Sequence, residues 1–168
     1  SLGARPIMAE HPNEVGEITK SSKALLLNLG NITDVRMKAM RISAVEAGKG
    51  NIPFIIDAVG IACSELRRRY LRKLLKGSKP SVIKGNYSEI MALASDEYTS
   101  SGVDAESLLT VESVGEAALK LAKELNTVIL ASGKTDIITD GKRLLHVNNG
   151  TAQLGKITGT GCMLGVIT

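Results

Sequence analysis

The segment from Thr158 to Cys162 reads Thr-Gly-Thr-Gly-Cys and stands directly before an apolar stretch, 163–167, that is typical of a buried helix. A turn that combines two glycines with small hydroxyl residues can expose consecutive backbone N–H groups. The helix start adds unpaired N–H groups and a partial positive charge. Together these features predict an anion hole suited to phosphate, including phosphate in transit. The same residues could instead form a glycine-rich helix entry that binds nothing.

More polar residues stand where apolar runs end. Asp57 ends one run, Lys84-Gly85-Asn86 ends the next, and Ser132 ends a third. Glu89 lies one turn into the helix that we predict after Asn86. Ligands of parallel α/β sheets bind beyond the carboxyl ends of the strands. We therefore expect these side chains to converge with the glycine-rich turn on one edge of a sheet.

Each of these residues also has an interpretation that requires no ligand. Asn86 and Glu89 fit an Asn-x-x-Glu capping box. Asp57 could cap a turn, Lys84 could be a surface charge, and Ser132 could belong to a plain turn. The functional hypothesis rests on the set, because an acid, a base, a hydroxyl group and an anion hole all stand at strand ends.

Strand and helix patterns alternate along the chain. Strands are predicted at 24–29, 52–57, 80–84 and 127–132, helices at 33–49, 64–77, 87–94 and 113–126, and an irregular loop at 95–110. Two short apolar runs around an Asp-Gly turn at 140–141 predict a β-hairpin. Right-handed βαβ units would build a mostly parallel sheet flanked by helices, which is one layered α/β domain.

Composition narrows the function classes. The chain has 168 residues, of which 43% are hydrophobic and only 2% aromatic, so its core must be aliphatic. The net charge is +4, and the basic run 67–73 has few aromatic residues that could stack on bases, which argues against nucleic-acid binding. The two cysteines form no CxxC motif, and no apolar run is long enough to span a membrane. We expect a cytoplasmic protein that binds neither nucleic acid nor membrane.

The sequence resembles the hydroxyethylthiazole kinase family, which consists of thiamine-salvage enzymes with a ribokinase-like fold. The resemblance lies in the order and spacing of five segments, which are 3–9, 28–30, 56–60, 82–90 and 158–162. The resemblance covers essentially the whole chain. Its most specific element is Cys162, because most ribokinase-like kinases have Asp there as catalytic base. The resemblance implies Mg²⁺- and ATP-dependent phosphorylation of the primary alcohol of 4-methyl-5-(2-hydroxyethyl)thiazole. It also implies a homotrimer with active sites between subunits.

The resemblance implies roles in binding both substrates. Met8 would contact the thiazole, and Gly159 would approach the substrate alcohol. Lys84 and Ser132 would contact ATP. The family usually has Arg in place of Lys84, and lysine keeps the charge but loses the bidentate fork.

The resemblance also implies roles in metal binding and catalysis. Glu89, together with Asp57, would organise Mg²⁺ through water. Thr160 and Gly161 belong to the anion hole, which would hold the charge that develops on the γ-phosphate. Cys162 would sit beside the attacking hydroxyl group, either accepting its proton or positioning the alcohol.

Two further differences from the family concern the backbone and the ends. Residue 58 is Ala where the family usually has Pro. The family's first strand would precede Ser1, and its final helices, which border the nucleotide, would follow Thr168. We therefore expect residues 1–168 to form a single ribokinase-like kinase domain that is incomplete at both ends.

Other functions remain open. A related kinase could act on hydroxymethylpyrimidine or pyridoxal, although Cys162 in place of Asp argues against it. A nucleotide-binding dehydratase or repair enzyme could share the fold, and a catalytically inactive nucleotide-binding scaffold is a further alternative. A Rossmann oxidoreductase is disfavoured, because no Gly-x-Gly-x-x-Gly follows an early strand.

Overall fold

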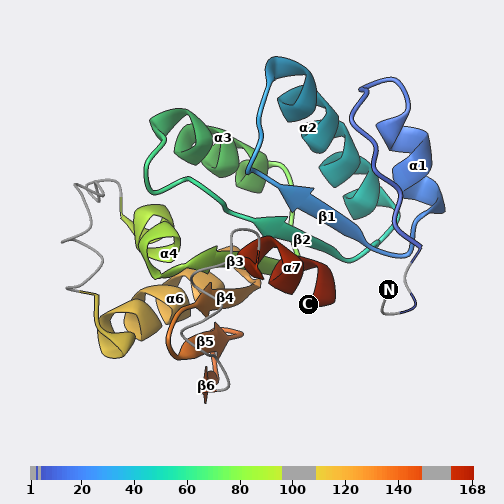
Figure 1. Cartoon of the computed structure of the whole chain (residues 1–168). Coiled ribbons are helices and arrows are strands. Elements are labelled where there is room, and N and C mark those ends of the chain that lie inside the picture. The colour runs from blue at the N-terminus through green and yellow to red at the C-terminus, as the bar shows by residue number, and fades with distance from the viewer. Residues whose placement is uncertain (1–2, 4, 96–108, 149–159) are drawn as a thin grey trace.

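The computed structural model of the protein describes residues 3, 5–95, 109–148 and 160–168, with the backbone alone for 160–162 and 167 (Figure 1). The elements in chain order are α1 (Val15–Ser21), β1 (Leu25–Asn28), α2 (Asp34–Lys49), β2 (Phe54–Asp57), α3 (Glu65–Lys76), β3 (Val82–Asn86), α4 (Tyr87–Ala94), α6 (Val111–Leu125), β4 (Val128–Ser132), β5 (Asp136–Thr139), β6 (Leu144–Val147) and α7 (Thr160–Ile167).

The strands form one six-stranded sheet in the order β1-β2-β3-β4-β5-β6. The pairs from β1 to β4 are parallel, and the hairpin β5–β6 continues the sheet in antiparallel fashion. The hairpin turn contains Gly141 at a φ of +85°, a left-handed conformation that glycine adopts without strain. The predicted mostly parallel α/β fold and its hairpin are confirmed.

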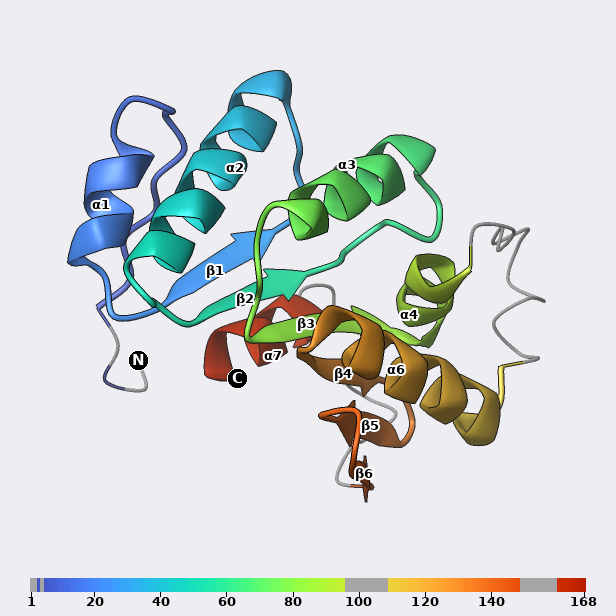
Figure 2. The same ribbon diagram turned by 180° about the vertical axis from the view of Figure 1, so that it is seen from behind.

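The helices divide between the two faces of the sheet. Strands that follow one another in the same direction through right-handed crossovers carry their connecting helices on one face. Helices α2 and α3 accordingly lie on one side of β1 and β2, and α7 lies on the other side (Figures 1 and 2). Helix α1 packs against α2. Among the described elements, only α7 is therefore placed to cover the second face of β1 and β2.

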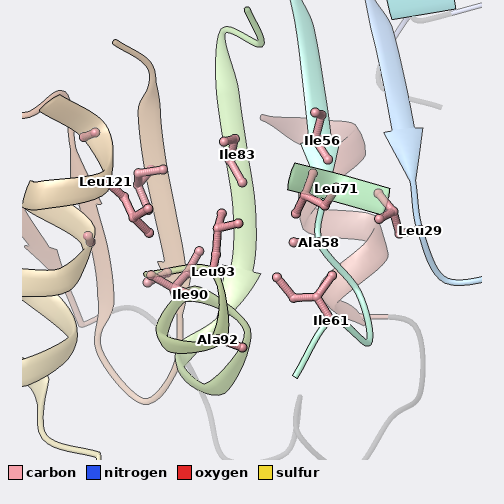
Figure 3. Packing of buried hydrophobic residues seen from close by; sticks show 14 of the residues in the cluster. Leu29, Ile56, Ala58, Ile61, Leu71, Ile83, Ile90, Ala92, Leu93 and Leu121 are labelled. Carbon is pink, nitrogen blue, oxygen red and sulfur yellow. The ribbon is translucent and has the colours of Figure 1, made fainter. Parts of the chain in front are cut away.

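The main core lies between the sheet and the first layer of helices. Ile56 and Ile83 from the strands pack with Leu71 of α3, Ile90 of α4 and Leu121 of α6 (Figure 3). Nearly all of this cluster is aliphatic, as the composition predicts. Its burial fixes the register of β2 and β3, because a slip by one residue would turn every side chain to the other face.

Side chains cap the starts of α2 and α3. The Thr33 side chain accepts a hydrogen bond from the N–H of Arg36, and that of Ser64 accepts one from Arg67. Such caps satisfy backbone donors that the first turn leaves unpaired. Helix α1 was not predicted, since its single buried turn, from Val15 to Thr19, is too short to show a periodicity.

Two expectations concern segments near the end of the chain. Most of the predicted loop 95–110 lies outside the described residues. The helix expected after residue 162 begins already at Thr160, so the residues from Thr160 to Cys162 form its first turn rather than a turn before it. The expectation of a buried helix is wrong for one face of α7, because Met163 and Val166 are 64% and 66% exposed.

No helix within the described ranges is both long and apolar enough to cross a bilayer.

Candidate active site

A row of polar residues crosses three strands at the carboxyl-terminal edge of the sheet. Asn28 of β1 stands beside Asp57 of β2, and Asp57 stands beside Lys84 of β3, as partners in the strand register. Side chains alternate between the faces of a strand. Since Ile56 and Ile83 face the main core, this polar row faces the side of the sheet where α7 lies.

Asp57 and Lys84 form a buried ion pair. The Lys84 Nζ donates to Asp57 Oδ1 over 3.2 Å, and Lys84 is 2% and Asp57 0% exposed. Buried charges persist only when they are paired and hydrogen-bonded. The interpretation of Lys84 as a surface charge is therefore wrong, and Asp57 does more than cap a turn.

Helix α7 lies directly over this ion pair. A Cβ atom added to Gly165 would lie 3.6 Å from Asp57 Oδ2 and 3.7 Å from Lys84 Cδ. Gly161 precedes Gly165 by four residues and so shares its face of the helix. The helix begins near the carboxyl-terminal ends of β1 and β2 and runs back along them (Figures 1 and 2).

Several residues of the glycine-rich motif can be placed only in part. Thr160, Gly161 and Cys162 lie in the first turn of α7, where backbone N–H groups have no partner within the helix. Gly159 lies outside the described residues. The structure therefore brings the start of α7 to the edge that carries Asp57 and Lys84.

Glu89 completes a capping box and also contacts the loop after β2. Its Oε2 accepts the N–H of Asn86 over 2.7 Å, and Asn86 Oδ1 accepts the N–H of Glu89 over 2.8 Å. Its Oε1 accepts the N–H of Gly60 over 2.8 Å, which ties the loop after β2 to α4. Burial raises the pKa of Glu89 above its usual value, the two backbone donors oppose this, and the Asp57 charge raises it further. The capping interpretation is confirmed, and the carboxylate stays at the edge of the polar row.

Ser132 lies on the same edge, one strand further along. It is the register partner of Asn86, and its Oγ donates to the carbonyl oxygen of Gly85 over 3.3 Å. The next residue, Gly133, packs so closely on the Tyr87 ring that a Cβ there would lie 2.6 Å from Tyr87 Cε1. The turn after β4 is therefore fixed against α4.

Met8 is not part of this group. It lies in the segment before α1, and its side chain is 88% exposed. The neighbouring Ile7 is 66% exposed. The structure thus places Asp57, Lys84 and Glu89 close together, whereas Met8, the predicted thiazole contact, lies outside this group.

Sequence reasoning gave no role to three residues that the structure adds to this edge. Asn28 donates to Asp57, and Gly165 is the residue of α7 that lies over the ion pair. Arg67 donates from Nη2 to the carbonyl oxygen of Gly30 over 3.1 Å and so holds the turn after β1. Only Asn28 carries a signal in the sequence, since it is a polar residue next to the end of the strand predicted at 24–29.

A separate groove lies at the opposite edge of the sheet. It has a volume of about 680 Å³ and lies where α2 and α3 end and β2 and β3 begin. Its charged residues are Lys76 and Lys79, which stand at a helix C-terminus, where a positive charge is favourable without any ligand. This groove offers no pair of opposite charges comparable to Asp57 and Lys84.

Comparisons with known proteins agree with the geometry. The model of the hydroxyethylthiazole kinase family matches residues 1–168. Hydroxyethylthiazole kinase 2 of Clostridium botulinum strain 657 is 47% identical over 169 residues, covering 98% of this chain and 64% of the relative. Hydroxyethylthiazole kinase of Thermoanaerobacter sp. strain X514 is 43% identical, with 98% of this chain and 62% of the relative covered. The chain thus spans less than two thirds of these relatives.

Solved structures show the same fold. The hydroxyethylthiazole kinase protein of Pyrococcus horikoshii OT3 superposes with a TM-score of 0.85 at 31% identity, over 98% of this chain and 60% of that one. The adenosine kinase of Sinorhizobium meliloti, at a TM-score of 0.59 and 15% identity over 84% of this chain and 39% of that one, shares the fold alone. The layered ribokinase-like fold is thereby confirmed, and the chain belongs to the hydroxyethylthiazole kinase family.

Proposed function

We propose that the protein transfers the γ-phosphoryl group of ATP to the primary alcohol of 4-methyl-5-(2-hydroxyethyl)thiazole, as a step of thiamine salvage. The observation that carries this proposal is the buried Asp57–Lys84 pair beneath α7 in a chain of this family. Phosphoryl transfer depends mainly on positioning and on stabilisation of charge. An edge that combines a cation, carboxylates and backbone N–H groups without a partner inside their helix meets both needs.

The start of α7 would receive the transferring phosphoryl group. Backbone N–H groups of Thr160 and Gly161 would donate to its oxygens, where a preorganised donor stabilises developing charge. Lys84 would contact ATP from below the helix. Its ammonium has three N–H donors, so it could keep Asp57 and still donate to a phosphate oxygen. Ser132 would contact the nucleotide at the end of β4.

Magnesium fits the carboxylates present. Mg²⁺ is usually held by one or two carboxylates together with waters and substrate phosphates, rather than by an all-protein cage. The described residues contain no group of three or more His, Cys, Asp or Glu placed for a metal, but they do bring Asp57 and Glu89 to one edge. These two would hold Mg²⁺ through water, and the bound ion would supply positive charge to the phosphates.

The thiazole alcohol would meet Cys162 and Gly159. An ordinary thiol has a pKa of about 8.5 and is mostly protonated at neutral pH. Cys162 would therefore orient the hydroxyl group and accept its proton late, in keeping with a loose transition state. Gly159 would allow the alcohol to approach the backbone.

We further propose a cytoplasmic homotrimer in which Met8 reaches the thiazole bound to a neighbouring subunit. Met8 and Ile7 are exposed apolar side chains that lie apart from the charged row. An active site between subunits would cover them. Light scattering of the purified protein, with Met8→Lys as a disrupting variant, tests this arrangement.

The experiment that tests the function is transfer of labelled phosphate from ATP to three alcohols. We expect the thiazole alcohol to be phosphorylated well above hydroxymethylpyrimidine and pyridoxal. Equal or reversed kcat/KM values would assign the protein to another vitamin kinase. ATP hydrolysis without any dependence on the thiazole would favour another nucleotide-binding enzyme, and an absence of turnover would favour a scaffold.

A further inference from the structure

We infer that Asn28 is a positioning residue, which aims the Asp57 carboxylate and affects phosphoryl transfer through it. This inference rests on the proposed function in so far as Asp57 takes part in the reaction. Asn28 is the last residue of β1 and the register partner of Asp57. Its Nδ2 donates to Asp57 Oδ2 over 3.2 Å.

The backbone determines which way the Asn28 amide points. The N–H of Gly30 donates to Asn28 Oδ1 over 2.7 Å. The opposite orientation would set the amide NH₂ against this N–H and the amide oxygen against the Asp57 carboxylate. Only the observed orientation satisfies both neighbours, so Asn28 must present a donor to Asp57.

The turn that holds the amide is itself fixed. A Cβ at Gly30 would lie 2.8 Å from Asn28 Oδ1, so a larger residue would displace the side chain. The Gly30 carbonyl oxygen accepts from Arg67, and the N–H of Leu29 donates to the Asp57 carbonyl oxygen over 3.1 Å. The backbone that positions the Asn28 amide is therefore hydrogen-bonded to α3 and to β2.

The two carboxylate oxygens of Asp57 accept hydrogen bonds from opposite sides. Lys84 on β3 holds Oδ1 and Asn28 on β1 holds Oδ2, each over 3.2 Å. The terminal torsion of an Asp side chain is broad, and donors on both oxygens together restrict the orientation of the carboxylate plane. Since a misplacement of about 1 Å can cost on the order of 100-fold in rate, loss of the Asn28 donor should lower turnover.

The test compares two changes of equal charge in one turn. Asn28→Asp keeps the shape and the acceptor for Gly30 but removes the donor to Asp57. Asn31→Asp makes the same change at an exposed residue that follows Gly30. We expect Asn28→Asp to lower kcat about 10-fold or more and to leave the KM for the thiazole alcohol unchanged. Asn31→Asp should leave both parameters unchanged. Equal effects of the two variants would overturn the inference.

A swapped double variant tests whether Asn28 acts through Asp57. Asn28→Asp combined with Asp57→Asn again offers a donor and an acceptor to each neighbour, with the carboxylate moved to β1. We expect the single variants to melt at lower temperature than the native protein, and the swap to recover part of that loss. Its turnover should equal that of Asp57→Asn alone, because a positioning residue has nothing left to position.

The outcomes separate this inference from the proposed function. A swap that melts below both single variants, or a further loss of turnover beyond Asp57→Asn, would overturn the role of Asn28. A native protein that phosphorylates none of the tested alcohols would refute the proposed function, while the melting temperatures of the four proteins would still test the contact between Asn28 and Asp57.

Discussion

Two neighbouring rows of residues cross the same three strands with opposite chemistry. Leu27, Ile56 and Ile83 are register partners that face the main core, and they are 4%, 0% and 0% exposed. One residue further along, the polar row begins with Asn28 and ends in the ion pair of β2 and β3, whose members are buried as deeply. Burial therefore does not distinguish the ion pair from the apolar row, but their energetics do.

The apolar row stabilises the fold by being buried, at roughly 25 cal/mol per Å² of apolar surface removed from water. The polar row loses hydration, and a buried ion pair often stabilises a protein no more than apolar residues of the same volume. A buried charged row at the ligand-binding edge of an α/β sheet is thus better explained by function than by stability. Substitutions in the two rows should separate these contributions.

The largest effect is expected for Lys84→Met. The variant leaves the Asp57 carboxylate buried without its cation, which costs about 3–5 kcal/mol of unfolding free energy. Adding Asp57→Asn should recover a large part of this loss, as measured by urea unfolding. Turnover should stay at least about 100-fold below the native value in both variants. A double variant that regains activity would show that the pair serves the fold alone.

The next largest effect is expected for Ile83→Ala in the apolar row. Truncation of this buried side chain should cost about 2–5 kcal/mol, through lost burial and a cavity. At a temperature where the variant is folded, its kcat should equal that of the native protein. A fall in kcat of more than a few-fold, at unchanged circular dichroism, would remove the contrast between the rows.

Substitutions at Gly165 test how closely α7 packs on the polar row. The space beside Asp57 and Lys84 admits a single methyl group at ordinary contact distance, so Gly165→Ala should leave stability unchanged or slightly raise it. Gly165→Val should lift α7 from the sheet at a cost of about 1–3 kcal/mol. Thermal unfolding and turnover of the two variants check this, and equal behaviour would mean that α7 does not press on the ion pair.

The smallest effect is expected for Ser132→Ala, which removes the hydrogen bond to the Gly85 carbonyl oxygen. Such a bond contributes about 0.5–1.5 kcal/mol. If Ser132 contacts ATP, the KM for ATP should rise while the KM for the thiazole alcohol stays unchanged. A change confined to stability would return Ser132 to a purely structural role.

Much of this arrangement could be predicted from the sequence. Apolar runs that end in Asp57 and Lys84 indicate parallel strands with polar carboxyl ends, and Thr33 indicates a helix start by its capping chemistry. The position of Glu89 also followed from its spacing to Asn86. These features depend on neighbours within a few residues.

The remainder depends on contacts between distant segments. The pairing of Lys84 with Asp57 follows from the register of β2 and β3, which core packing determines. The hydrogen bond from Asn28 to Asp57 follows in the same way from the register of β1 and β2. The close approach of Gly165 to the ion pair depends on where α7 lies, and no pattern within 160–167 specifies that position.

The central claim is tested most directly by one comparison of phosphate transfer from ATP to 4-methyl-5-(2-hydroxyethyl)thiazole. Three proteins are compared: the native protein, Asp57→Asn and Ile56→Val, each verified as folded by its melting temperature. The account predicts that the native protein and Ile56→Val transfer phosphate at similar rates, whereas Asp57→Asn is slower by on the order of 100-fold or more. Native turnover in Asp57→Asn, or equal losses in the two variants, would contradict it.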